Sequence, residues 1–143
     1  MTALLDVNAL VALAWPNHVH HASALEWFGE HASAGWATCP VTESGFVRVS
    51  SNRRALPTAT TVAAADDLLA ALRKLEGHRF WTDDISVATC QEVDVHGLAG
   101  YRLVTDAHLV ALATRRGGRL VTFDRAVRAL AAAPDTVVLL STV

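Results

Sequence analysis

Lysine is almost absent from this chain of 143 residues, and cysteine is scarce. Lys74 is the only lysine, and no GxxxxGK[ST] loop occurs, which excludes a P-loop nucleotide-binding enzyme. Cys39 and Cys90 stand alone, without a CxxC pair or a disulfide framework. This cysteine usage fits a reducing compartment rather than a secreted, disulfide-stapled protein.

The N-terminal segment lacks the marks of a secretory or membrane sequence. No arginine or lysine precedes Arg48, and the first apolar run is broken by Asp6 and Asn8. We therefore expect no signal peptide, no membrane span and a cytoplasmic protein. The length suits one domain, and neither repeats nor linkers divide the chain, so residues 1–143 are expected to form a single domain.

The overall charge gives little support to nucleic-acid binding. The formal net charge is -2, whereas nucleic-acid-binding domains are often basic. The basic residues are nearly all arginine, however, and arginine suits bidentate contact with phosphate or carboxylate. Apolar residues make up 52% of the chain, which is high for a small domain and indicates an apolar surface that a partner covers.

Short apolar runs alternate with helical patterns along the chain, which predicts an α/β fold with a mainly parallel sheet. Thr42 and Thr105 are predicted helix N-caps. The predicted strands cover residues 3–5, 35–38, 79–81, 119–122 and 137–140. The predicted helices cover residues 9–15, 20–31, 43–50, 63–75, 83–95, 106–115 and 125–132.

Four acids occupy comparable positions in this pattern. Asp6 follows the first strand and Asp124 follows the fourth, while Glu43 and Asp106 open helices. Residues that follow parallel strands, or open the next helices, lie along one edge of the sheet, and ligands bind outside that edge. All four carboxylates can therefore face one crevice.

Four carboxylates in one crevice repel one another strongly. Two charges about 4 Å apart cost roughly 4 kcal/mol at an effective dielectric near 20. A helix N-terminus offsets only about 0.3–1 kcal/mol. Either some of the acids are protonated, or a divalent cation lies among them. Hard oxygen ligands favour Mg²⁺ or Mn²⁺, which can activate water and stabilise the leaving oxygen of a phosphodiester.

Four segments, in order, resemble the motifs of PIN-domain ribonucleases, and most closely those of VapC-type toxins of bacterial toxin–antitoxin pairs. The first is Leu4-Leu5-Asp6-Val7-Asn8-Ala9-Leu10. The second is Thr42-Glu43-Ser44-Gly45-Phe46-Val47-Arg48-Val49. The third is Tyr101-Arg102-Leu103-Val104-Thr105-Asp106-Ala107-His108-Leu109, and the fourth is Leu120-Val121-Thr122-Phe123-Asp124.

This resemblance implies a three-layer α/β/α sandwich whose five strands have the order 3-2-1-4-5. It implies an endoribonuclease that depends on Mg²⁺, with Mn²⁺ as a substitute, that is inhibited by a cognate VapB-type antitoxin and that forms a homodimer. The implied metal-binding and catalytic acids are Asp6, Glu43, Asp106 and Asp124. Asn8 and Thr122 are the implied supporting residues, which orient acids or water.

Basic, histidine and tryptophan residues supply further candidates. One basic group, Arg48, Arg53 and Arg54, could steer RNA phosphate or receive an antitoxin carboxylate, or could simply be solvated. A second group, Arg115, Arg116 and Arg119, is more typical of a solvated helix end. The histidines His18, His20, His21 and His108 are assigned to helix starts and packing. The tryptophans Trp15, Trp27, Trp36 and Trp81 are assigned to the core or to an interface rather than to base stacking.

Two other functions compete with the nuclease. A haloacid-dehalogenase-like phosphatase also carries an aspartate after its first strand, but it needs a second aspartate where Asn8 stands, and a lysine near the site. A phosphate-acceptor receiver domain is excluded, because it needs the same lysine and this chain lacks it. A non-catalytic module would use the acids only as helix caps and dock a partner on its apolar surface. Binding of Mn²⁺ distinguishes the nuclease from that module, since mere caps gain no stability from metal.

Overall fold

The computed structural model describes residues 1–142, and five short parallel strands form its central sheet. The strands are β1 (Ala3–Leu5), β2 (Trp36–Thr38), β3 (His78–Phe80), β4 (Arg119–Thr122) and β5 (Val137–Leu139). They lie side by side in the order β3-β2-β1-β4-β5, which confirms the expected order. In the middle of the sheet, Leu4 of β1 is aligned with Ala37 of β2 and with Leu120 of β4.

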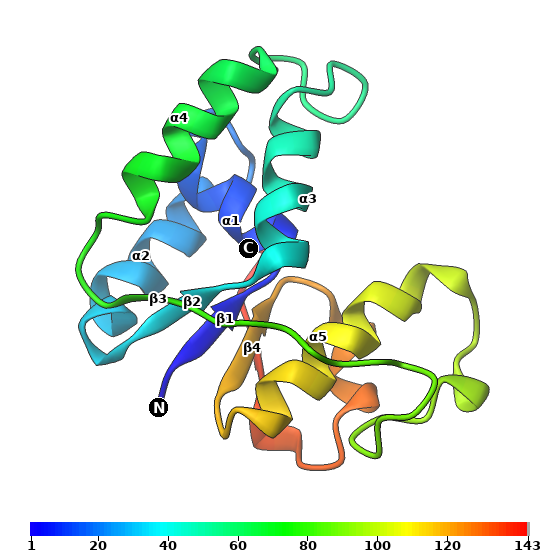
Figure 1. Ribbon diagram of the computed structural model, residues 1–143. Coiled ribbons are helices and arrows are strands. Elements are labelled where there is room, and N and C mark those ends of the chain that lie inside the picture. The colour runs from blue at the N-terminus through cyan, green and yellow to red at the C-terminus, as the bar shows by residue number, and fades with distance from the viewer. Residues whose placement is uncertain (143) are drawn as a thin grey trace.

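Helices cover both faces of this sheet, which confirms the three-layer α/β/α fold (Figure 1). Side chains alternate along a strand, so Ala3 and Leu5 face one core and Leu4 faces the other. The first core is covered by α1 (Val7–Ala14), α2 (His21–His31), α3 (Pro40–Ser50) and α4 (Val62–Leu72). The second is covered by α5 (Val104–Arg115) and the 3₁₀ helix η4 (Arg125–Leu130). Short 3₁₀ turns complete the chain: η1 (Ala32–Ala34), η2 (Val95–Gly97), η3 (Tyr101–Leu103) and η5 (Pro134–Thr136).

Several predicted helix boundaries are wrong. α1 begins at Val7 because Asp6 is itself the N-cap. α3 begins at Pro40 with Cys39 as N-cap, and Thr42 instead closes the capping box from the third helical position. α5 begins at Val104, so Thr105 lies inside its first turn rather than capping it.

The helix predicted for residues 125–132 is also different, because residues 125–130 form the 3₁₀ helix η4. The helix predicted over residues 83–95 does not form at all. That segment is irregular, with a turn at 87–89 and η2 at its end. Asp83 Oδ1 accepts a hydrogen bond of 3.0 Å from the Ile85 N–H, a local contact that competes with helix formation.

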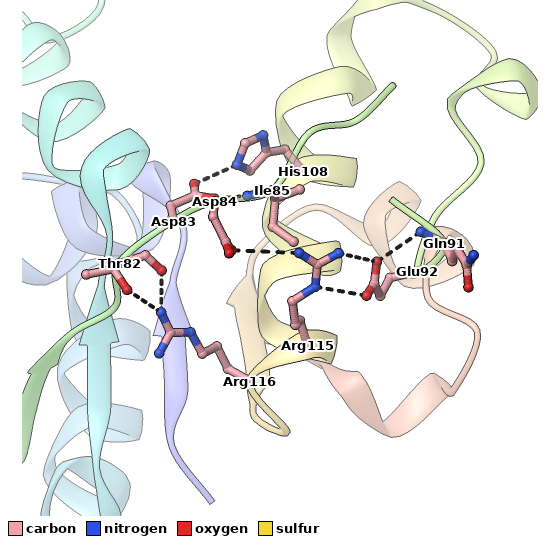
Figure 2. A network of polar contacts seen from close by, with 9 residues as sticks. All are labelled: Thr82, Asp83, Asp84, Ile85, Gln91, Glu92, His108, Arg115 and Arg116. Carbon is pink, nitrogen blue, oxygen red and sulfur yellow. Dashed lines mark hydrogen bonds and ion pairs between the residues drawn. The ribbon is translucent and has the colours of Figure 1, made fainter. Parts of the chain in front are cut away.

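Polar contacts fasten this irregular segment to α5 (Figure 2). Asp83 Oδ2 lies 2.6 Å from His108 Nε2, and the Asp83 side chain is only 6% exposed. Arg115 makes two bonds to the Glu92 carboxylate, at 3.1 and 3.2 Å, and Arg116 bonds to the backbone and side-chain oxygens of Thr82. Two arginines of the second basic group therefore hold the chain together, and α5 is fixed from its first half to its C-terminus.

The described residues contain no helix that combines the length and the apolar character required to span a bilayer.

Candidate active site

Asp6 lies at the carboxyl end of the central strand, where β1 passes directly into α1. Its backbone N–H donates to the Val121 carbonyl at 3.1 Å, which fixes it against β4. Its Oδ1 accepts the Ala9 N–H at 2.8 Å and so caps α1. The residue is only 5% exposed. A carboxylate is thus held in a buried and rigid position at the edge of the sheet.

Thr122, at the end of β4, connects Asp6 with Asp124. It is fully buried, and its side chain hydrogen-bonds the Asp6 carboxyl group while its hydroxyl oxygen accepts the Asp124 N–H at 3.1 Å. Asp124 in turn caps η4 by accepting the Ala126 N–H at 2.9 Å. One threonine therefore sets the relative positions of two acids on neighbouring strands.

Asp106 reaches the same region from the other helical layer, in the first turn of α5. Burial raises the pKa of Asp6 to about 6; hydrogen bonds from Thr122 and Ala9 oppose this rise, and the charges of Asp106 and Asp124 add to it. Burial, and then the charge of Asp124, raises the pKa of Asp106 to about 6 as well. The charges of neighbouring acids therefore disfavour ionisation of Asp6 and of Asp106.

The chemistry of these groups fits a hard divalent cation. Within residues 1–142, no three His, Cys, Asp or Glu side chains stand close enough together to coordinate one ion directly. Mg²⁺ commonly uses one or two carboxylates and keeps several waters, so a group of separated carboxylates suits it. No ion pair within those residues neutralises Asp6, Asp106 or Asp124.

Glu43, the fourth predicted acid, has different partners. Its Oε2 accepts a hydrogen bond of 2.6 Å from the Thr38 hydroxyl, and its Oε1 lies 3.2 Å from the guanidinium of Arg73. Thr38 Oγ1 also lies 2.8 Å from His78 Nε2. The structure therefore places Asp6, Asp106 and Asp124 within electrostatic reach of one another, but it directs the Glu43 carboxylate toward the C-terminal end of α4.

The other predicted residues lie around this group. Asn8 is exposed in the first turn of α1. Arg48 is exposed on α3 and lines a groove of about 410 Å³ that also contains Val7 and Thr105, the neighbours of Asp6 and Asp106. Gly45, which also lines this groove, lets α3 approach α1 closely, because an added Cβ there would collide with the Val7 side chain. A larger groove of about 600 Å³ lies between α3 and α4 and also includes Arg48.

The remaining basic and histidine candidates are divided by the structure. Arg53 and Arg54 are exposed after α3. His21 packs as expected, with Nδ1 2.8 Å from the Ala12 carbonyl oxygen. His20 does not only start a helix, since its ring stacks on Phe123 beside Asp124. Sequence reasoning missed that contact, together with Thr38, Arg73 and His78, because all of them depend on tertiary structure.

Comparison with known proteins shows the family to which the chain belongs. Residues 3–133 match the PIN domain family, and the chain belongs to that family. Ribonuclease VapC38 of Mycobacterium tuberculosis is 60% identical over 129 residues, covering 90% of this chain and 89% of the relative. Ribonuclease VapC39 of the same organism is 56% identical over 126 residues, covering 88% and 91%.

Within the PIN family the chain is accordingly a VapC-type toxin, a ribonuclease that hydrolyses phosphodiester bonds, and the predicted class is confirmed. Among solved structures, a chain from the crystal structure of VapBC2 from Rickettsia felis bound to a DNA fragment from their promoter is similar over 99% of this chain and 100% of its own, with a TM-score of 0.69. Its sequence identity is 13%, so the likeness concerns the fold.

Proposed function

We propose that this ribonuclease is a metal-dependent endoribonuclease, the toxin of a toxin–antitoxin pair, which cuts RNA at the crevice formed by Asp6, Asp106 and Asp124. One observation carries the proposal. A buried carboxylate, with its pKa raised to about 6, shares its surroundings with two further acids that no cation of the described chain neutralises. Such an arrangement is costly for folding and useful for holding a divalent cation.

The residues divide the work as follows. Asp6, Asp106 and Asp124 would hold Mg²⁺, or Mn²⁺ in its place. When bound, the cation supplies an activated water and neutralises charge on the phosphate. Thr122 keeps Asp6 and Asp124 in register through its buried hydroxyl. Hydrolysis by water would leave a 5′-phosphate and a 3′-hydroxyl.

Glu43 is proposed as the fourth metal-binding acid, and its partners define what that role demands. To turn toward the other acids, its carboxylate must give up the Thr38 hydroxyl and the Arg73 guanidinium. Because Arg73 is partly exposed, its ion pair is worth about 1 kcal/mol or less, which a divalent cation can exceed. Glu43, or water held by it, is then available at the crevice, and Asn8 lies at the adjoining first turn of α1.

The substrate approach is assigned to the groove beside Thr105. Arg48 lines that groove and is exposed, so its guanidinium can pair with an RNA phosphate. Arg53 and Arg54 are exposed in the segment that follows α3, and they add two further positive charges to that of Arg48. These contacts would position the RNA backbone without selecting its sequence.

A VapB-type antitoxin and a second copy of the chain are the proposed protein partners, and the cytoplasm is the proposed compartment. The VapC names of the relatives and the VapBC title of the structural neighbour support the antitoxin. Large apolar side chains stay exposed near the site, among them Tyr101 and Val104 at the start of α5. They are the kind of surface that a partner covers. That residues 1–143 form one domain also remains a prediction.

The test is RNA cleavage by the wild type and by two matched aspartate variants. Asp6→Asn keeps the N-cap but removes the buried charge, whereas Asp135→Asn changes an exposed acid at the start of η5. We expect discrete cuts with Mg²⁺ or Mn²⁺ in the wild type and in Asp135→Asn. With EDTA, or in Asp6→Asn, these cuts should disappear. Folded wild type that neither cuts RNA nor gains thermal stability from Mn²⁺ would contradict the proposal and favour a binding module.

A further inference from the structure

We propose that three aromatic rings, those of His18, His20 and Phe123, form a row that contacts the RNA nucleotides beside the bond that is cut. We call it the ring row. The inference rests on the ribonuclease site proposed above and adds to it a substrate-binding surface outside the carboxylates.

The ring row begins at the catalytic edge of the sheet. Phe123 stands between Thr122 and Asp124, so its position is set by the same strand end that sets two site residues. The His20 ring stacks on it, with ring centroids 4.9 Å apart and planes inclined by 26°. The His18 ring follows at 5.7 Å from His20, inclined by 51°. The row therefore leads from the acids toward the turn between α1 and α2.

That turn is held in one conformation by its own hydrogen bonds. The His20 N–H donates to His18 Nδ1 at 3.0 Å, and the His18 N–H donates to the Trp15 carbonyl at 3.0 Å. The His21 N–H then donates to the His18 carbonyl at 3.0 Å, and the His21 ring is tied to Ala12. A preorganised turn loses little conformational entropy when a ligand binds to it.

The ring row is accessible and chemically suited to nucleotides. All three rings are half-buried, and Val19 between the two histidines is 84% exposed. Burial, and then the charges of His20 and His21, lowers the pKa of His18, which favours the neutral form of this ring. Neutral aromatic rings stack on nucleobases without sequence preference, and imidazole N–H groups can donate to ribose or phosphate oxygens. A scissile phosphate in the crevice beside Asp124 would place its neighbouring nucleotide at the start of this row.

His20, in the middle of the row, is the residue to change. With an RNA that the wild type cuts, His20→Ala should raise KM about tenfold, at the lower end of what loss of one stacking contact gives, and leave kcat within about twofold. His20→Phe, which keeps a ring, should restore most of the affinity. Phe123→Leu gives a second variant with an apolar anchor but no ring, and it should raise KM in the same way.

His31 provides a matched control. Its ring stacks on Trp27 with centroids 4.9 Å apart and planes inclined by 12°, and it lies near Met1 and Arg119 at the opposite edge of the sheet. His31→Ala should leave KM, kcat and the affinity for Mn²⁺ unchanged. Thermal unfolding and Mn²⁺ titration of each ring-row variant separate loss of RNA contact from loss of fold or of metal binding.

Direct contact is tested by photo-cross-linking. RNA that carries 5-iodouridine is bound to the Asp6→Asn variant, which leaves the RNA uncut, and the complex is irradiated. Cross-links at His18, His20 or Phe123 would support the ring row. Cross-links confined to other segments, together with an unchanged KM in His20→Ala, would overturn the ring row. If the wild type still cut RNA, the proposed ribonuclease function would stand. Absence of any cutting by the wild type would instead refute the function proposed above. If the ring-row variants lost binding to a protein partner but kept their RNA contacts, that result would also count against the ring row.

Discussion

Replacing Asp6 by asparagine should make the metal-free protein more stable at pH 8 while abolishing RNA cleavage. The Asp6 carboxyl is buried, and its pKa rises from 3.8 to about 6 on folding. Between these values the folded chain holds a proton that the unfolded chain has released, so stability falls as pH rises through this window and stays lower above it. At about 1.4 kcal/mol per pH unit, the loss amounts to about 3 kcal/mol.

Asparagine avoids this loss because it carries no charge and is as good an N-cap as aspartate. We therefore expect Asp6→Asn to exceed the wild type by up to about 3 kcal/mol in urea unfolding at pH 8 with EDTA, or by roughly 10 °C in Tm. Near pH 4 the two proteins should be almost equally stable. Mn²⁺ at about 1,000 times Kd should reverse the order, since this concentration stabilises a binding-competent protein by about 4.1 kcal/mol.

The control is Asp135→Asn, which changes an exposed aspartate and should leave both the stability and its pH dependence nearly unchanged. A variant Asp6→Asn that is less stable than the wild type at pH 8, or a difference between them that does not grow from pH 4 to pH 8, would refute the electrostatic reasoning.

Two further substitutions test the surroundings of the acids. Thr122→Val removes a buried hydroxyl that serves both Asp6 and Asp124, so urea unfolding should show a loss of about 1–3 kcal/mol and cleavage should fall sharply, whereas Thr122→Ser should retain both. His108→Ala leaves the Asp83 carboxylate buried without its partner at 2.6 Å, so about 1–3 kcal/mol should again be lost. In that variant limited proteolysis should cut within residues 82–92 first, and Asp83→Asn should rescue part of the stability; cleavage at unrelated sites would contradict the fastening role of this pair.

Backbone positions were more predictable than side-chain partners. The turn from Leu5 through Asp6 into α1 was visible because an apolar strand, an acid and a helical pattern follow one another within a few residues. The segment 83–95 was not, since its conformation depends on contacts with α5 about 25 residues further along the chain. The direction of the Glu43 carboxylate was equally hidden, because its partner Arg73 lies 30 residues away on α4.

The contrast between compensated and uncompensated acids is what connects this fold to catalysis. Glu43 and Asp83 are both largely buried, yet each has a basic partner and a hydrogen-bond donor, so the fold itself compensates the burial of both carboxylates. Asp6 and Asp106 have none of that basic compensation, and burial raises the pKa of each to about 6. A carboxylate that lowers stability at neutral pH needs a benefit outside folding, and a cation that arrives from solution supplies both the missing charge and the chemistry. The same argument explains why Thr122 is buried between two acids: its hydroxyl holds them in place without neutralising either, which keeps their charge for the cation.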